Sequence, residues 1–170
     1  MDHLWSSWRL AYITGERRTT DCVFCTALTD EEAAPLILFR GRTCFIILNL
    51  FPYNNGHLMV VPNRHIGTLA AAEPDELSEL IELTRRSEIA LTEAYAPHGM
   101  NVGINLGKPA GAGILDHLHM HVVPRWNGDT NFMTVIGRTR VLPEELPQTG
   151  ERLRPLFEKL ARVSGPTDKA

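Results

Sequence analysis

Three histidines at alternate positions form the strongest chemical pattern in the sequence. His117, His119 and His121 are separated by single apolar residues. In an extended strand, side chains alternate between the two faces, so the three imidazoles are expected to project to one side while Leu118 and Met120 point into the core. Imidazole can act near neutral pH as a nucleophile, a proton carrier or a metal ligand. The pattern therefore predicts a functional strand face, with a three-histidine metal site and incidental surface histidines as the alternatives.

A second group of candidate ligands begins with the Cys-x-x-Cys pair Cys22 and Cys25. A thioredoxin-like redox site needs a βαβ neighbourhood, whereas the residues after Cys25 are expected to lead into an acidic loop. A structural zinc site needs four ligands, and His65 and His117 are the best-placed partners along the chain. Two unrelated free thiols are the alternative. Cys44 lies in an apolar run and is interpreted as a small buried residue.

The segment 107–113 is rich in glycine and lies shortly before the histidines. It lacks the Gly-Lys-Ser/Thr ending of a P-loop, and it precedes a strand where a dinucleotide fingerprint would precede a helix. Its backbone N–H groups could still approach phosphate oxygens, with Lys108 adding positive charge. A flexible connection between strands is the alternative interpretation.

The elements that must position these residues follow from the apolar periodicity. Short apolar runs separated by turn residues predict strands, and a periodic segment from Pro74 to about Ala96 predicts a long helix. A second helix is expected over about 148–163. The predicted strands are 35–39, 43–49, 57–61, 100–106 and 117–123. Strands that come in runs, and not in βαβ alternation, indicate an α+β fold.

Length and composition indicate one ordinary soluble domain. The chain has 170 residues, of which 44% are apolar and 22% charged, which is enough for a real core. No apolar run approaches the roughly 18 residues of a membrane span, and Asp2 and His3 stand where a signal peptide would carry its basic start. A cytoplasmic protein with no membrane contact is therefore expected. We predict one domain over 1–163 and a disordered tail over 164–170.

The formal net charge of −3 argues against a surface that coats nucleic acid. The excess acid is confined to the predicted long helix, because residues 73–93 hold seven acidic residues and two arginines. The rest of the chain is mildly positive and can accommodate a phosphate site.

The segment 117–123 resembles the pattern of the histidine-triad (HIT) family of nucleotide-binding hydrolases and transferases, in which histidines alternate with apolar residues. Further similar segments are 49–62 and 98–105, so the resemblance covers a core of about 20–126. The aromatic segment 4–13 and the segment 125–132 are similar to the bacterial branch of diadenosine tetraphosphate hydrolases and phosphorylases. The resemblance implies a HIT-like fold of about five antiparallel strands, with one long helix packed on the sheet and a C-terminal helix.

The resemblance also implies roles for individual residues. His119 would attack the α-phosphorus of a nucleoside polyphosphate and form a nucleotidyl-imidazole, while His121 would bind the α-phosphate oxygens. One ring nitrogen of His119 should donate to a backbone carbonyl, so that the other faces phosphorus. Asn49 would contact the sugar or support the site. The remaining residues expected at the nucleotide phosphates are Asn105, Lys108, Gly111 and Gly113.

Family members with Cys-x-x-Cys bind zinc through that pair, a histidine after the third strand and the first histidine of the triad. These positions correspond to Cys22, Cys25, His65 and His117. Four protein ligands leave no open position for water, so the Zn²⁺ would be structural. Many members carry Gln where this chain has Gly113, which leaves the final acceptor, water or phosphate, open. The resemblance further implies a homodimer formed through the long helix and a sheet edge.

The leading hypothesis is an enzyme that cleaves diadenosine tetraphosphate or triphosphate through a nucleotidyl intermediate on His119, with AMP as a product of hydrolysis. A close alternative hydrolyses nucleoside phosphoramidates or adenylylated amines. From other classes, the chain could be a zinc-stabilised nucleotide-binding module with little turnover, or a thiol redox protein that uses Cys22 and Cys25.

Overall fold

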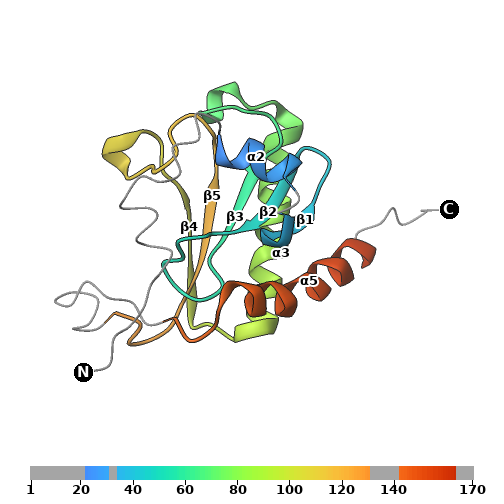
Figure 1. The fold of residues 1–170 in the computed structure, drawn as a ribbon, viewed down its shortest axis with the longest axis vertical. Helices are drawn as coiled ribbons and strands as arrows, with labels where there is room; N and C mark the ends of the chain where they lie inside the picture. The colour runs from blue at the N-terminus through green and yellow to red at the C-terminus, as the bar shows by residue number, and fades with distance from the viewer. Residues whose placement is uncertain (1–21, 31–33, 131–141, 164–170) are drawn as a thin grey trace.

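The computed structural model describes residues 22–30, 34–130 and 142–163, which build an antiparallel sheet of five strands with helices on both faces (Figure 1). The strand order is β1-β2-β3-β5-β4. The strands are β1 (Ile37–Arg40), β2 (Cys44–Leu48), β3 (Leu58–Pro62), β4 (Gly99–Ile104) and β5 (Met120–Arg125). The predicted α+β class and five-stranded sheet are confirmed. The aromatic segment 4–13 and the tail 164–170 lie outside the described residues.

The described part of the chain contains three α-helices and three short 3-10 turns. The α-helices are α2 (Val23–Thr29), α3 (Pro74–Tyr95) and α5 (Leu146–Val163), and the turns are η1 (Ala34–Leu36), η2 (Leu69–Ala71) and η3 (Lys108–Ala110). The two predicted long helices are therefore confirmed. At the start of α3, the Glu73 N–H donates to the Glu76 carboxylate at 2.8 Å, which satisfies a backbone donor that the helix cannot pair.

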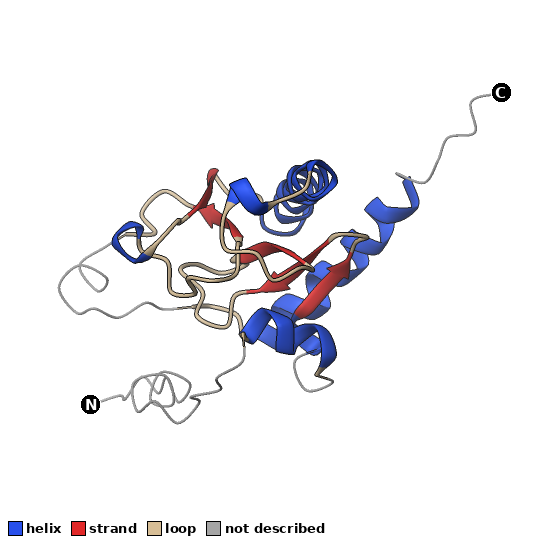
Figure 2. Ribbon diagram, turned by 90° about the horizontal axis from the view of Figure 1, so that it is seen from above, coloured by secondary structure: helices blue, strands red, loops and turns tan. Residues whose placement is uncertain are grey.

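Apolar side chains cover both faces of the central strands, and β2 and β3 are buried throughout. Figure 2 shows α3 and α2 on opposite sides of the sheet. The face toward α3 and α5 packs against Leu80, Leu83, Leu91, Leu153 and Phe157. The opposite face packs against Phe24 and Ala27 of α2. Burial on both faces explains why these strands read as continuous apolar runs and not as alternating ones.

The residues directly after Cys25 belong to helix α2, which the sequence did not predict, and of the acidic loop expected beyond them only Asp30 lies among the described residues, outside the helix. Phe24 and Ala27 lie three residues apart, which places them on the same side of a helix, and both are buried against the sheet. The helix has only seven residues and no side-chain cap. Its stability must therefore come from this tertiary packing, which periodicity in so short a segment does not reveal.

The histidine-rich segment is strand only in its second half. β5 begins at Met120, so His117 and His119 precede the paired strand, whereas the sequence predicted a strand over 117–123. The ladder between β3 and β5 ends at the pair Val60 with Met120. Continued pairing would run into Pro62, which has no N–H to donate, and the chain before Met120 therefore leaves the ladder.

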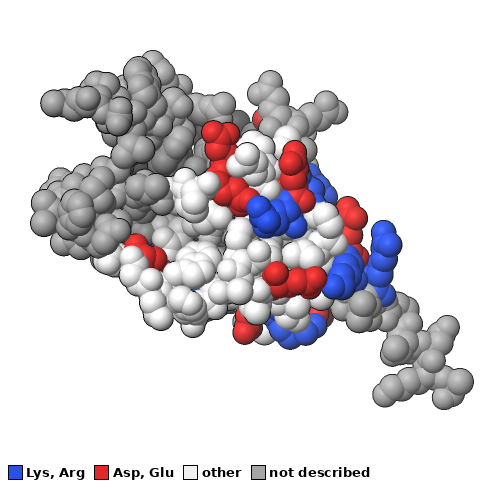
Figure 3. Space-filling view, turned by 90° about the horizontal axis from the view of Figure 1, so that it is seen from below, with Lys and Arg blue, Asp and Glu red and all other residues white. Residues whose placement is uncertain are grey.

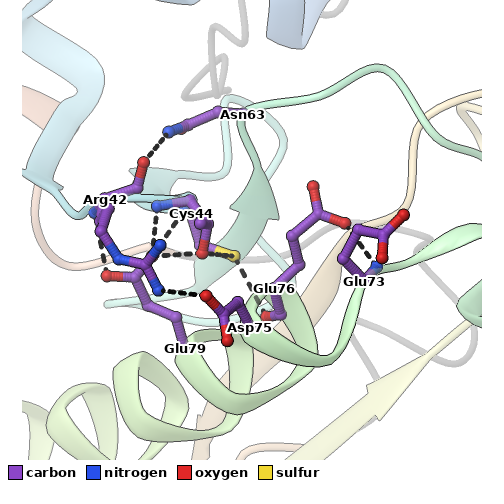
Figure 4. Close-up of polar contacts among 8 residues, drawn as sticks. Arg42, Cys44, Asn63, Glu73, Asp75, Glu76 and Glu79 are labelled. Carbon is purple, nitrogen blue, oxygen red and sulfur yellow. Dashed lines mark hydrogen bonds and ion pairs between the residues drawn. The ribbon is translucent and has the colours of Figure 1, made fainter.

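A carboxylate on α3 fastens the turn between β1 and β2 to the helix (Figure 4). Glu79 accepts hydrogen bonds from the backbone N–H groups of Arg42 and Cys44, both at 2.9 Å, and from that of Thr43. Burial raises the pKa of the Glu79 carboxyl, but these hydrogen bonds outweigh it and hold the pKa below its usual value. A side chain at Gly41 would meet the Glu79 carboxylate at 2.6 Å, which explains the glycine in this turn.

Acidic and basic side chains are mixed over the face drawn in Figure 3, where neither sign forms a continuous field. On α3, Glu82 pairs with Arg85 at 2.8 Å and with Arg86 at 2.9 Å. Asp75, Glu76 and Glu93 also pair with basic residues, Arg42, Arg64 and Lys159, so much of the acid on this helix is neutralised locally. Among the helices that the structure describes, none is both long and apolar enough to cross a membrane.

Candidate active site and metal centre

The four predicted metal ligands converge at one end of the sheet. The ligand atoms of Cys22, Cys25, His65 and His117 all lie within 4.8 Å of one another. Sγ of Cys22 lies 3.2 Å from Nδ1 of His117, and Sγ of Cys25 lies 3.4 Å from Nδ1 of His65. The sequence prediction that these residues meet in space is confirmed.

Three separate elements bring these ligands together. Cys22 is the N-cap of α2 and Cys25 lies in its first turn, so a spacing of three residues places both sulfurs on one side. His65 follows β3, and His117 precedes β5. Nε2 of His117 lies 2.9 Å from the carbonyl oxygen of Pro62. Since that oxygen only accepts, Nε2 carries the proton and the lone pair of Nδ1 faces the sulfurs.

The geometry of this cluster is compatible with tetrahedral zinc. Zinc–sulfur bonds of about 2.3 Å and zinc–nitrogen bonds of about 2.0 Å place sulfur and nitrogen ligands about 3.5 Å apart. The sulfur-to-nitrogen distances here are 3.2, 3.4 and 3.6 Å. Two thiolates and two imidazoles suit zinc chemically, and together they occupy all four positions. Cys44 is separate from the cluster: it is buried in the core, and burial raises the pKa of its thiol to about 12.

His119 is held with one ring nitrogen directed into the site. Its Nδ1 donates to the carbonyl oxygen of His117 at 2.8 Å, so the lone pair lies on Nε2, as the sequence analysis expected. Burial lowers the pKa of His119 and outweighs the carbonyl hydrogen bond, which raises it, so the ring is neutral at pH 7. The ring centroids of Phe24 and His121 lie 5.1 Å and 4.9 Å from that of His119.

His121 is oriented by His57, a residue for which the sequence predicted no role. The Tyr53 N–H donates to Nδ1 of His57 at 3.0 Å, and Nε2 of His57 lies 2.9 Å from Nδ1 of His121. Because a backbone N–H can only donate, Nδ1 of His57 must accept, and its Nε2–H must donate to His121. Neutral His121 therefore carries its own proton on Nε2. Burial lowers the pKa of His121 to about 4, which keeps it neutral at pH 7.

Two adjacent imidazoles thus have opposite hydrogen-bonding character: His119 offers a lone pair at Nε2 and His121 offers an N–H at Nε2. A nucleophile beside a hydrogen-bond donor is suited to attack on an anionic centre whose oxygens gain charge. The one available sequence signal for His57 is a polar residue directly after Gly56 and before the fully buried strand β3.

Asn49 supports this arrangement from the loop between β2 and β3. Its Oδ1 accepts the Phe51 N–H at 2.9 Å, and its side-chain nitrogen lies 3.3 Å from Nδ1 of His57. Its own N–H donates to the His57 carbonyl at 3.0 Å. These contacts fit the predicted site-supporting role of Asn49, whereas contact between Asn49 and the sugar stays a prediction.

A second support for the same loop comes from the start of α5. The carboxylate of Glu144 accepts hydrogen bonds from Asn55 at 3.2 Å, from the Tyr95 hydroxyl at 2.5 Å and from Thr149 at 2.9 Å. These contacts join the loop, the end of α3 and α5. Gly56 is confined next to this junction, because a Cβ there would lie 3.1 Å from the Tyr95 ring and its φ is +74°.

The glycine-rich loop contains η3, with left-handed glycines at Gly107 (φ +82°) and Gly111 (φ +94°). The Gly111 N–H donates to the Lys108 carbonyl at 3.0 Å, so in this conformation it serves the loop itself. At Gly113, a Cβ would meet no atom of the described residues within 4 Å. Asn105 lies against the loop, with its amide nitrogen 3.8 Å from a Cβ built at Gly111. Phosphate binding by these residues stays a prediction.

A hollow of about 260 Å³ adjoins His121 on the face of the sheet away from α3. Residues that line it include Tyr53, Asn101, Gly103, Asn105, His121 and Arg125. Arg125 donates to both carboxylate oxygens of Asp129, at 2.6 and 2.7 Å, and to Oδ1 of Asn101 at 2.6 Å. Of these lining residues, only Asn105 and His121 were predicted to bind the nucleotide.

Comparisons with known proteins agree with this arrangement. The model of the HIT domain family matches residues 30–128. A protein named AP-4-A phosphorylase from Mycobacterium tuberculosis is 47% identical over 122 residues, which cover 72% of this chain and 62% of that protein. An uncharacterized HIT-like protein from Saccharolobus solfataricus is 30% identical over 112 residues, which cover 66% of this chain and 79% of that protein. The chain thus spans less than two thirds of the length of the first relative.

Solved structures show the same fold. A Zn-bound histidine triad family protein from Mycobacterium smegmatis is similar with a TM-score of 0.68 and 29% identity, covering 85% of this chain and 99% of that one. A hypothetical histidine triad nucleotide-binding protein from Sulfolobus tokodaii is similar with a TM-score of 0.69 and 26% identity, covering 88% and 100%.

Proposed function

This chain belongs to the HIT domain family, and on that premise we propose that it is an enzyme that cleaves dinucleoside polyphosphates such as diadenosine tetraphosphate or triphosphate. The observation that carries the proposal is the pairing of His119 and His121, whose rings lie 4.9 Å apart, the first with a lone pair at Nε2 and the second with an N–H at Nε2. The relative named AP-4-A phosphorylase supports this substrate class.

In the first step, Nε2 of His119 attacks the α-phosphorus of the substrate. The nitrogen–phosphorus bond forms while the bond from that phosphorus to the bridging oxygen breaks, and the oxygen leaves with the electron pair as part of a nucleoside polyphosphate. Nε2–H of His121 donates to the phosphate oxygens as they gain charge. Nδ1–H of His119 stays on the His117 carbonyl and helps to stabilise the cationic nucleotidyl-imidazole.

In the second step, an acceptor oxygen attacks the same phosphorus and displaces Nε2 of His119, which regains its lone pair. With water as the acceptor, AMP and a proton are released, whereas with inorganic phosphate the product is ADP. Diadenosine tetraphosphate therefore yields ATP together with either AMP or ADP. The acceptor must approach from the side that the leaving group vacates, opposite Nε2 of His119.

We also propose that Cys22, Cys25, His65 and His117 hold a structural Zn²⁺. When bound, the ion supplies a cross-link between α2, the segment after β3 and the segment before β5, and such a link contributes directly to folding stability. With all four positions taken by protein ligands, the site would not activate water. The metal site is linked to the proposed reaction by the backbone carbonyl of His117, which accepts a hydrogen bond from His119 and orients its ring.

A homodimer and a cytoplasmic location complete the proposal. β4 is an edge strand of the described sheet. The side chains of Val102 on β4 and of Ile81 on α3 are 51% and 60% exposed. Exposed apolar side chains beside an unpaired strand edge support a self-association surface there. Sedimentation analysis of the purified chain tests the dimer.

Product analysis tests the enzymatic proposal. The zinc-loaded protein is incubated with diadenosine tetraphosphate with and without inorganic phosphate, and nucleotides are separated by chromatography. AMP with ATP indicates hydrolysis, and ADP with ATP indicates phosphorolysis. A faster reaction with adenosine phosphoramidate would favour the phosphoramidate hydrolase, and no cleavage of any adenosine polyphosphate would contradict the proposal.

A further inference from the structure

We infer that the hollow beside His121 is the subsite for the leaving nucleotide, the half of the substrate that is not transferred to His119. This inference rests on the proposed function, because it assigns the second half of the same dinucleotide. The hollow measures about 260 Å³, close to the lower end of the roughly 300–1,000 Å³ typical of small-molecule sites.

The direction of the reaction favours this side of the site. In displacement at phosphorus, the attacking and leaving atoms lie roughly in line on opposite sides. Behind His119, the space is filled by the buried side chains of Phe24 and His117, whose rings lie 5.3 Å apart. Beyond His121, the same face of the sheet continues to Val123 and opens into the hollow. A group that departs from phosphorus on the side away from His119 therefore has room in the hollow next to His121.

Gly103 keeps this space open. It pairs with His121 across β4 and β5, so a side chain at this position would stand next to the His121 ring on the same face. The register is unbroken from Gly99 to Ile104, and the φ of Gly103 is not in the left-handed region, so neither a bulge nor a turn requires glycine here. No atom of the described residues lies within 4 Å of a Cβ built at Gly103. Glycine inside a regular strand weakens it and often marks close approach of a ligand.

The walls of the hollow have the chemistry that a nucleotide needs. Asn101 and Asn105 supply amide groups that can bind phosphate or sugar oxygens, and Arg125 supplies a cation at the far end. The Asp129 side chain is 12% exposed while that of Arg125 is 42% exposed, so the carboxylate fixes the guanidinium from behind and leaves it accessible. Tyr53 lies over His121 with ring centroids 5.8 Å apart and planes inclined by 25°, and it forms an aromatic wall.

The substitution Gly103→Leu tests the subsite by filling it. Two substrates with the same adenylyl group are compared: diadenosine tetraphosphate, which has a nucleotide leaving group, and adenosine 5′-phosphorimidazolide, whose leaving group is a single imidazole ring. We expect kcat/KM for the dinucleotide to fall by at least about tenfold, while the value for the phosphorimidazolide stays within about twofold. Met100→Leu is the control on the same strand, because the Met100 side chain lies on the opposite face and packs against the core.

The outcomes separate the subsite from the proposed function. Equal effects of Gly103→Leu on both substrates, or no effect on the dinucleotide, would overturn the subsite. Failure of the wild-type protein to cleave either compound would instead contradict the proposed function. Thermal denaturation and AMP binding by calorimetry show whether the variant is folded. Should it not fold, Asn101→Ala makes the same comparison at an exposed residue and carries the same expectation.

Discussion

The carbonyl oxygen of His117 accepts a hydrogen bond from Nδ1 of His119 at 2.8 Å. The imidazole of His117 lies among the cysteines of the metal cluster, while its backbone orients the ring proposed as the nucleophile. The two sites therefore share one residue. A change that moves the backbone at position 117 must also turn the ring of His119.

We expect His119→Ala to lower kcat for diadenosine tetraphosphate by at least about 10⁴-fold, because the attacking nitrogen is removed. AMP affinity should remain within about tenfold, since other residues contact the nucleotide. Steady-state kinetics and calorimetry measure the two quantities. An unchanged turnover rate would contradict the assignment of His119.

The substitution His57→Leu should lower kcat on the order of 10- to 100-fold with little change in KM, because His121 loses the donor that keeps its own proton on Nε2. His98→Leu is the matched control. Nδ1 of His98 accepts the Asn127 N–H at 2.9 Å, outside the site. Similar losses in both variants would show that His57 has no special role in orienting His121.

Replacement of Cys22 or Cys25 by Ser should remove bound zinc and lower Tm by about 5 °C or more, as expected when a domain of this size loses 2 kcal/mol or more. Cys44→Ser should retain the metal, because Cys44 lies in the core apart from the cluster. Elemental analysis and thermal denaturation give the two readouts. One zinc per chain in the Cys22 variant would contradict the four-ligand site.

Stability should depend on pH through Glu79. Its pKa is lowered in the folded state, so its contribution is present above the unfolded-state pKa of about 4.5 and is lost as pH falls through the lower folded-state pKa. Glu79→Gln should cost about 1–3 kcal/mol at pH 7, because three backbone donors lose their carboxylate.

Urea denaturation of the wild type and of Glu79→Gln measures this contribution between pH 7 and pH 3. The difference between the two proteins should shrink as the solution becomes more acidic. The control is Glu88→Gln, an exposed position on the same helix, which should change little. A difference that stays constant over this pH range would rule out the assigned role of the carboxylate.

Much of the fold was predictable because its signals are local. Pro74 and the acids after it mark the start of α3, and the apolar runs between turn residues became the five antiparallel strands β1 to β5. α2 was missed because seven residues without a side-chain cap become helical through the contacts of Phe24 and Ala27 with the sheet. The start of β5 was misplaced because Pro62, on another strand, ends the ladder.

Residue type and spacing determined by themselves which side chains could do chemistry: the alternating histidines, the Cys-x-x-Cys pair and the glycine-rich loop. Only the tertiary structure decided which ring nitrogens of His119 and His121 carry a proton, and so which ring can attack and which can donate a hydrogen bond. The proton of His121 is placed by Tyr53 and His57, from a loop more than 60 residues earlier in the chain. The space beside His121 exists because Gly103 faces it from the neighbouring strand. Both depend on contacts between distant segments, and no local pattern encodes them.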